Sequence, residues 1–145
     1  MRGFVDTNIF VYASYSSFPA FEKARRFLKE CLEGDDLWYT SWGVIYEYLR
    51  VVTHPTLFPK KPLTLGEALG NVSRFVKAPR VEVLLETETH LQLMEQLEKE
   101  LPSLKGSILH DAHMVVLMRE HELGTIYSAD TDLHRFKGIS VVNPC

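Results

Sequence analysis

The sequence predicts an α/β protein, a three-layer α/β/α sandwich around a five-stranded, mostly parallel sheet. Short apolar runs alternate along the chain with longer segments whose apolar residues recur at helical spacing. Strands separated by helices form a parallel sheet that carries helices on both faces. With 145 residues, 46% of them hydrophobic, the chain is long enough for one domain, residues 1–145, with its own core.

The strands are expected where short apolar runs occur, at residues 4–5, 37–39, 81–85, 126–127 and 139–142. The helices are expected where apolar residues recur every three to four positions, at residues 19–33, 42–53, 65–76, 90–102 and 107–122. Thr64 with Glu67 forms a capping-box pattern, and Thr89 with Gln92 resembles a second cap. Residues 53–62, which contain three prolines, form the only long loop expected.

The composition favours a cytoplasmic protein with no membrane partner. No apolar segment reaches the roughly 18 residues of a membrane-spanning helix, and no secretory signal is visible at the N-terminus. Cys31 and Cys145 fit neither a disulfide framework nor a zinc-ligand spacing.

Carboxylates follow the first and the fourth expected strand. Asp6 comes directly after Phe4-Val5, and Asp130 and Asp132 come shortly after Ile126-Tyr127. In an open α/β sheet, ligands bind outside the carboxyl ends of the strands, near the point where strand order reverses. These side chains can therefore share one crevice. Because an acidic crevice is unfavourable unless a positive group fills it, we expect a divalent cation and a metal-dependent active site there.

Two further carboxylates lie within expected helices. Asp111 shares a side of its helix with Ile108 and Val115, and an ionised carboxylate on such an apolar face needs a partner or a metal. A buried aspartate paired with an arginine, or capping a neighbouring backbone, is the alternative. Glu47 lies among aromatic residues, although an exposed glutamate on a helix is common.

The acidic positions and their neighbours resemble the PIN-domain nucleases, and in particular the VapC toxins of prokaryotic toxin–antitoxin operons. The matching pieces are Val5-Asp6-Thr7-Asn8, Glu47 within residues 42–50, His110-Asp111-Ala112-His113, and Ser128-Ala129-Asp130-Thr131-Asp132-Leu133. The resemblance spans essentially the whole chain, and residues 49–55 are similar to one VapC subgroup. No single motif is specific, but four motifs in this order are.

The resemblance implies a ribonuclease that cleaves RNA phosphodiester bonds by metal-activated water, with Mg²⁺ or Mn²⁺ as cofactor. The catalytic residues and metal ligands that it implies are Asp6, Glu47, Asp111 and Asp130. Carboxylates are hard oxygen donors that suit both cations, and no serine or cysteine nucleophile is needed. The residues that would orient these carboxylates are Thr7, Asn8 and Ser128. Such short polar residues equally suit strand ends and helix caps.

Asp132 and the histidines leave alternatives open. Asp132 either helps to hold a second cation or caps the turn that begins at Leu133. His110 and His113 flank Asp111 but lie on other sides of the helix. We expect these two histidines to contact other helices or solvent and not the site.

The charge balance also allows two interpretations. The net charge is −3, from 16 basic and 19 acidic residues, but without the five acids of the expected pocket 14 acidic residues remain and the net is +2. Basic residues cluster at positions 23–29, 60–61, 74–80 and 135–137. These clusters form either a phosphate-binding rim around the acidic crevice or solvated helix faces.

The resemblance also implies a homodimer that is held inactive by a small antitoxin protein. Aromatic residues are frequent in residues 18–27 and 42–58. Phe21 lies off the apolar stripe of its helix, and Tyr46 and Tyr48 cannot both face the sheet. We expect exposed aromatic side chains here to form a groove for an antitoxin segment, whose Arg or Lys would enter the acidic pocket.

Three other function classes fit less well. A haloacid-dehalogenase-type phosphatase typically has a second Asp where this chain has Asn8, and a receiver domain would take Thr and Lys from its last two strands, where Ser128 and Asn143-Pro144 stand. A non-catalytic PIN-fold module that binds RNA or protein is the main alternative. Degenerate members are expected to lose acidic residues, and this chain retains all four.

Overall fold

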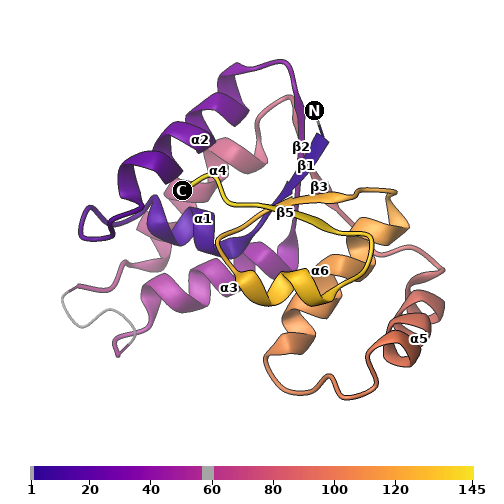
Figure 1. Ribbon diagram of the computed structural model, residues 1–145. Helices are drawn as coiled ribbons and strands as arrows, with labels where there is room; N and C mark the ends of the chain where they lie inside the picture. The colour runs from indigo at the N-terminus through magenta and orange to yellow at the C-terminus, as the bar shows by residue number, and fades with distance from the viewer. Residues whose placement is uncertain (1, 57–60) are drawn as a thin grey trace.

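The computed structural model describes residues 2–56 and 61–145, and its centre is a sheet of five strands in the order β3-β2-β1-β4-β5 (Figure 1). The strands are β1 Arg2–Val5, β2 Leu37–Ser41, β3 Val81–Leu84, β4 Thr125–Tyr127 and β5 Ser140–Val142. All four strand pairings are parallel. The five expected strands are therefore confirmed.

Helices connect the strands in the described part of the chain. They are α1 Thr7–Tyr12, α2 Phe21–Glu33, α3 Trp42–Thr53, α4 Leu65–Val76, α5 His90–Glu100, α6 Ile108–Glu120 and the 3₁₀ helix η1 Thr131–Arg135. The capping box of Thr64 and Glu67 is present at the start of α4. The second expected cap is wrong, because the Thr89 side chain makes no capping hydrogen bond and its hydroxyl lies 2.9 Å from that of Thr87.

The helices cover both faces of the sheet, which confirms the three-layer sandwich. On one face, Phe27 of α2 packs against Trp38 of β2 and Tyr127 of β4. Gly3 of β1 lies beneath this cluster, where a Cβ atom would stand 2.4 Å from Cε2 of Tyr127, so only glycine fits. Right-handed crossovers place α5 and α6 on the opposite face from α2 and α4, as Figure 1 shows.

The packing of α1, α3 and α4 separates the two tyrosines that were expected not to face the sheet together. Tyr48 is fully buried against Phe10, and its hydroxyl lies 2.6 Å from that of Ser14 and accepts a hydrogen bond from Asn71. Tyr48 is therefore a core residue, because the face of α3 that it occupies is covered by α1 and α4. Tyr46 is 70% exposed, as the opposite side of the helix requires. Phe58, at the end of the aromatic-rich region, lies outside the described residues.

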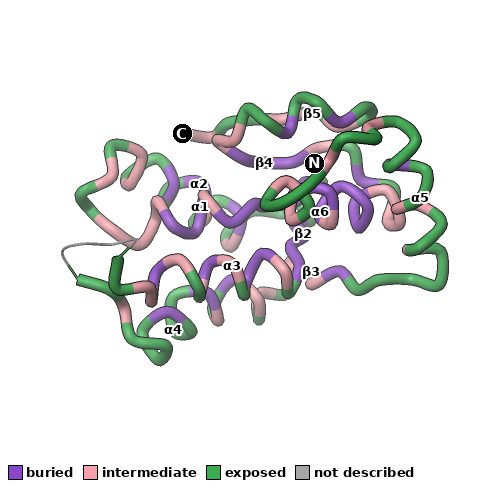
Figure 2. The backbone as a smooth tube through the Cα atoms, turned by 90° about the horizontal axis from the view of Figure 1, so that it is seen from below, coloured by how far each residue is buried: buried purple, intermediate pink, exposed green. Residues whose placement is uncertain are grey.

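Buried residues are concentrated in β1, β2, β4 and α6, whereas α5 is mostly exposed (Figure 2). Among the described helices, none is long and apolar enough to cross a membrane. The strand order reverses between β1 and β4, since the chain runs from β1 to β2 and β3 on one side and places β4 and β5 on the other. The carboxyl ends of these two strands are thus the place where a ligand site is expected.

Candidate active site

Asp6 lies at the carboxyl end of β1 and is only 4% exposed. Its backbone N–H donates to the carbonyl oxygen of Tyr127 at 3.1 Å, which joins the ends of β1 and β4. Its carboxylate accepts hydrogen bonds from the N–H of Thr7 at 2.6 Å and the hydroxyl of Ser128 at 2.7 Å. Burial raises the pKa of Asp6, while these two hydrogen bonds lower it.

Asn8 and Ser128 hold the surroundings of Asp6 in place. The Asn8 amide donates to Ser128 Oγ at 2.9 Å and to Asp6 Oδ2 at 3.3 Å, and its oxygen accepts from the N–H of Ala129. Ser128 Oγ also accepts from the N–H of Asp130 at 3.0 Å. The Thr7 hydroxyl points elsewhere and donates to the carbonyl of Val44 in α3. Asn8 and Ser128 therefore contact Asp6 by their side chains, and Thr7 only by its backbone.

Asp111 lies in the first turn of α6 and is half-buried. Burial and the negative charges of Asp130, Asp6 and Asp132 raise its pKa to about 7. Within the described residues Asp111 forms no salt bridge, so the alternative of a structural pair with arginine is not what the structure shows. Its carboxylate faces other carboxylates.

Glu47 and Asp132 each lie beside an arginine three positions later. Glu47 of α3 accepts hydrogen bonds from Arg50 Nε at 3.0 Å and Nη2 at 2.5 Å, and this pair lowers the pKa of Glu47. Asp132 Oδ1 lies 3.6 Å from Arg135 Nη2. The side chain of Asp130 accepts from the Asp132 N–H at 2.9 Å, so that Asp130, and not Asp132, caps η1.

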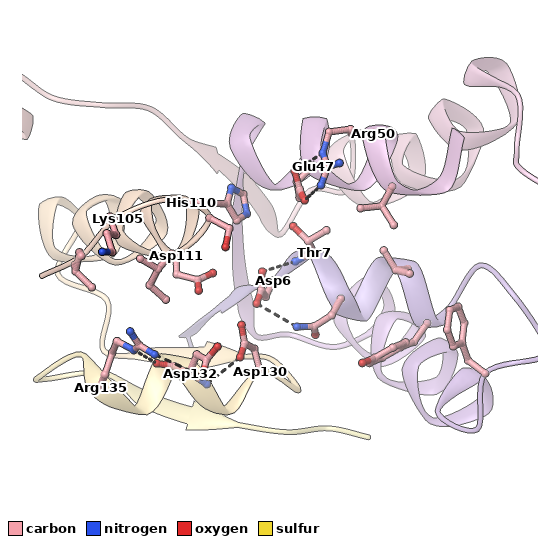
Figure 3. Close-up of a pocket in the computed structure, with 18 of the residues that line it drawn as sticks. Asp6, Thr7, Glu47, Arg50, Lys105, His110, Asp111, Asp130, Asp132 and Arg135 are labelled. Carbon is pink, nitrogen blue, oxygen red and sulfur yellow. Dashed lines mark hydrogen bonds and ion pairs between the residues drawn. The ribbon is translucent and has the colours of Figure 1, made fainter. Parts of the chain in front are cut away.

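One pocket of about 1000 Å³ brings the five predicted carboxylates together (Figure 3). They come from the β1–α1 junction, α3, α6, and the segment after β4, and they are Asp6, Glu47, Asp111, Asp130 and Asp132. Figure 3 shows Asp6, Asp111 and Asp130 facing one another, with the two arginine pairs to either side. Thr7 and Asn8 also line the pocket, while Ser128 lies buried behind Asp6.

The positive side chains that line the pocket are Arg50, Lys105 and Arg135. Only Arg135 belongs to a basic cluster noted in the sequence. Four basic residues of α2 and α4 instead line a second groove, between these two helices, and they are Arg25, Arg26, Lys29 and Arg74. Lys60 lies outside the described residues. The rim is thus made of single residues from separate elements.

His110 lines the same pocket, and the expectation that it lies outside the site is wrong. Successive helix residues differ by only 100° in direction, so a pocket that extends from α6 to α3 includes both His110 and Asp111. His110 lowers the pKa of Asp6 and Glu47, and its Nε2 atom is buried without a hydrogen-bond partner. His113 points away, with Nε2 2.7 Å from Glu86 Oε1, as expected for a residue outside the pocket.

The donor chemistry of the pocket fits a hard divalent cation. Within the described ranges, no group of three or more His, Cys, Asp or Glu side chains is arranged to hold a metal ion. Asp6, Asp111 and Asp130 nevertheless supply oxygen donors, and their mutual repulsion contributes to the raised pKa of Asp111. A divalent cation would relieve that repulsion, and small side-chain rotations would bring the oxygens around it.

Comparison with known proteins identifies the family. The model of the PIN domain matches residues 3–139. The chain belongs to the PIN-domain family. This PIN domain is 34% identical over 139 residues to Ribonuclease VapC48 of Mycobacterium tuberculosis, covering 96% of this chain and 94% of that protein. It is 27% identical over 135 residues to Ribonuclease VapC37 of the same species, covering 93% and 92%. These relatives place it among the VapC-type proteins.

Two solved structures share the fold of this PIN domain. VapC20 of Mycobacterium tuberculosis, described as a toxin that cleaves the sarcin-ricin loop, superposes with a TM-score of 0.64 at 19% identity, covering 91% of this chain and 92% of VapC20. VapBC2 of Rickettsia felis, bound to a DNA fragment from its promoter, gives a TM-score of 0.69 at 16% identity and covers 99% and 98%.

Proposed function

We propose that this PIN domain is a metal-dependent endoribonuclease and the toxin of a toxin–antitoxin pair. The observation that carries the proposal is the meeting of Asp6, Asp111 and Asp130 in one pocket at the point where strand order reverses. The negative charge of Asp130 raises the pKa of Asp6, and those of Asp130 and Asp6 raise the pKa of Asp111, so a cation would be favoured among them. The ribonuclease names of VapC48 and VapC37 support RNA as the substrate.

In this proposal the carboxylates of the pocket bind Mg²⁺ or Mn²⁺. The proposed catalytic residues and ligands are Asp6, Glu47, Asp111 and Asp130, with Asp132 as a further candidate ligand. A bound cation would supply an activated water and would neutralise charge on the non-bridging phosphate oxygens. Ser128 and Asn8 fix the orientation of Asp6 through their hydrogen bonds to Oδ2.

The three cations of the rim are proposed to bind the RNA backbone. Arg50, Lys105 and Arg135 line the same pocket as the carboxylates, so phosphates on either side of the cleaved bond would come within their reach. Guanidinium groups bind phosphate oxygens in a bidentate manner, and such contacts position the strand without reading its sequence.

Sequencing of RNA 5′ ends after induction of the protein in cells tests the proposed reaction. We expect new 5′ ends at defined positions with the wild type and none with Asp6→Asn. In vitro, EDTA should stop cleavage of the same RNA. Specific RNA binding without any new 5′ ends would instead favour a non-catalytic PIN module.

We also propose that the protein forms a homodimer and that an antitoxin inhibits it; the VapBC2 structure supports the antitoxin partner. The groove between α2 and α4, about 960 Å³, combines apolar side chains such as Phe21 and Phe75 with the four basic residues named above. An amphipathic segment with acidic residues fits this surface. Phe21 belongs to the groove as expected, whereas Tyr46 does not line it.

A further inference from the structure

Two arginine–carboxylate pairs stand on different sides of the pocket, Glu47–Arg50 on α3 and Asp132–Arg135 on η1 (Figure 3). Between them lie Asp6, Asp111 and Asp130, for which the described residues provide no Lys or Arg within salt-bridge distance. At the centre of the pocket, three aspartates thus have no Lys or Arg partner among the described residues. On either side, the negative charges of Glu47 and Asp132 are each paired with an arginine. A cation entering the pocket meets central aspartates that have no Lys or Arg partner among the described residues, whereas Glu47 is already paired with Arg50.

We propose that Arg50 is a phosphate-binding residue that leaves Glu47 when RNA binds, so that RNA makes Glu47 more available to the metal ion. This inference rests on the proposed function. It assigns to Arg50 a positioning role toward Glu47 and a direct role toward the substrate backbone.

The geometry of the pair explains why Glu47 is less available to a metal ion without RNA. Arg50 Nε donates to Oε2 of Glu47 at 3.0 Å, and Nη2 donates to Oε1 at 2.5 Å, so the fork of the guanidinium engages both carboxylate oxygens. A divalent cation on the same carboxylate would stand beside this positive charge, and the two would repel each other. Metal and Arg50 therefore compete for Glu47.

The exposure of the two side chains explains why the exchange is easy. The Arg50 side chain is 59% exposed and that of Glu47 only 30%, so Arg50 can swing out while Glu47 stays at the pocket wall. Exposed ion pairs between neighbouring helix residues contribute only about 0.2–1 kcal/mol. A phosphate offers the guanidinium the same bidentate geometry as the carboxylate, so RNA can replace Glu47 as its partner.

The metal half of the inference is tested by titrating Mn²⁺ without RNA, by calorimetry. R50Q should bind Mn²⁺ more tightly than the wild type, by about 1.5- to 5-fold, the factor that corresponds to the energy of an exposed pair. The gain should vanish when E47Q is also present. K105Q is the matched control, since Lys105 lines the pocket but belongs to another wall. Any gain from K105Q should be the same with and without E47Q.

The RNA half is tested by fluorescence anisotropy of a labelled single-stranded RNA in EDTA, where no cleavage is expected. E47Q should bind RNA more tightly by a similar factor, because Arg50 is released, and this gain should disappear in the presence of R50Q. R50Q alone should bind RNA more weakly. Both residues are on the surface, and circular dichroism verifies that the variants are folded.

An R50Q variant with unchanged or weaker Mn²⁺ binding would overturn the inference, as would a gain that persists with E47Q. In both cases the wild type would still bind Mn²⁺ and RNA, and the proposed nuclease would stand. A wild-type protein that binds neither Mn²⁺ nor RNA would overturn the proposed function and this inference together.

Discussion

Asp111 is the residue whose protonation depends most clearly on the pocket. Its pKa is raised to about 7 in the folded protein, from 3.8 for an unperturbed aspartate, by burial and by the neighbouring aspartates. The native state therefore holds the proton more tightly than the unfolded state does. Between these two values, without metal, the free energy of unfolding contributed by Asp111 falls as the pH rises.

Asp111→Asn should abolish this loss of stability at rising pH. We expect the variant, measured in EDTA, to melt at a higher temperature than the wild type at pH 8 and to show a flatter melting-temperature profile from pH 4 to pH 8, since clustered acids repel one another. Asp35→Asn is the matched control, because the Asp35 side chain is fully exposed. Parallel profiles for the wild type and Asp111→Asn would contradict the assignment.

Mn²⁺ should stabilise the wild type and have little effect on Asp111→Asn. A ligand that binds only the native state adds about 2.7 kcal/mol to the free energy of unfolding at a concentration 100 times its Kd. Thermal melts with increasing Mn²⁺ measure this gain directly. If the wild type gains no stability from Mn²⁺, the proposal of a metal site in this pocket is contradicted.

The hydroxyl of Ser128 helps to hold the loop after β4 against the start of α1. It donates to Asp6 Oδ2 and accepts from Asn8 and from the N–H of Asp130. Ser128→Ala should lower the free energy of unfolding by about 1–3 kcal/mol, because buried polar groups lose their partner. The same change should weaken Mn²⁺ binding about 10- to 100-fold.

Urea unfolding and Mn²⁺ titration of Ser128→Ala measure the two effects separately. Ser17→Ala, at an exposed position, serves as the control. Unchanged Mn²⁺ affinity in Ser128→Ala would mean that the hydroxyl stabilises the fold without orienting Asp6.

The groove between α2 and α4 is best probed through Phe21. Phe21→Ala should reduce capture of the antitoxin in a co-expression pull-down, because it removes apolar surface from the groove. Tyr46→Ala, which changes an exposed residue outside the groove, should leave capture unchanged. Tyr48→Ala is unsuitable, since truncating a fully buried aromatic residue costs about 3–5 kcal/mol. Equal capture by Phe21→Ala and the wild type would place the antitoxin elsewhere.

Elements with a clear apolar period were predictable from the sequence, and α1 was not. Its six residues, Thr7–Tyr12, are mostly β-branched or aromatic and too few to display a helical period. The helix forms because Asp6 accepts the N–H of Thr7 and because Phe10 packs against Tyr48 and Phe75. The contacts of Phe10 are tertiary, whereas the Asp6 cap is local and does not by itself predict a helix. Similarly, Thr89 failed as a cap because its hydroxyl pairs with that of Thr87, whose own hydroxyl donates to Glu120 of α6.

Asp6, Asp130 and Asp132 could be inferred because strand ends meet at a known edge of a parallel sheet, whereas Asp111 and Glu47 lie in helices and were assigned to the site through the family resemblance. The rim could not be inferred. Arg50 and Lys105 stand outside the basic clusters of the sequence and meet only through the packing of separate elements. His110 was expected outside the site because it lies about 100° from Asp111 around the helix axis. The pocket extends over more than one face of α6 and therefore includes both residues. The buried Nε2 of His110, the signal that distinguishes it from His113, exists only in three dimensions.

At the scale of the whole molecule, the affinity for RNA should fall as the salt concentration rises. The fall should be steeper the more cations of the rim bind phosphates. Each neutralised phosphate of a single strand contributes a slope of about −0.7 to log K against log salt, so the three cations predict a slope of about −2. Anisotropy titrations in EDTA at several salt concentrations measure it. A slope near zero would contradict a rim that tracks phosphates.

The proposed homodimer is tested by size-exclusion chromatography with light scattering on the isolated protein. We expect twice the mass of 16.7 kDa at micromolar concentration. A monomeric mass throughout the concentration range would exclude the dimer. It would leave the pocket unaffected, because all five carboxylates come from one chain.

Because the pocket forms only when β1 pairs with β4, we expect nuclease activity to appear late in folding. Asp6 and Ser128 are 122 positions apart, so a long loop must close before the two strand ends meet. Contacts of such sequence separation form slowly, and a partly folded molecule can hold its local helices while its aspartates are still dispersed. A nuclease assembled in this way has no complete pocket until β1 and β4 pair. In a refolding experiment, RNA cleavage should therefore return with the slowest structural phase, so that toxicity itself reports the last step of folding.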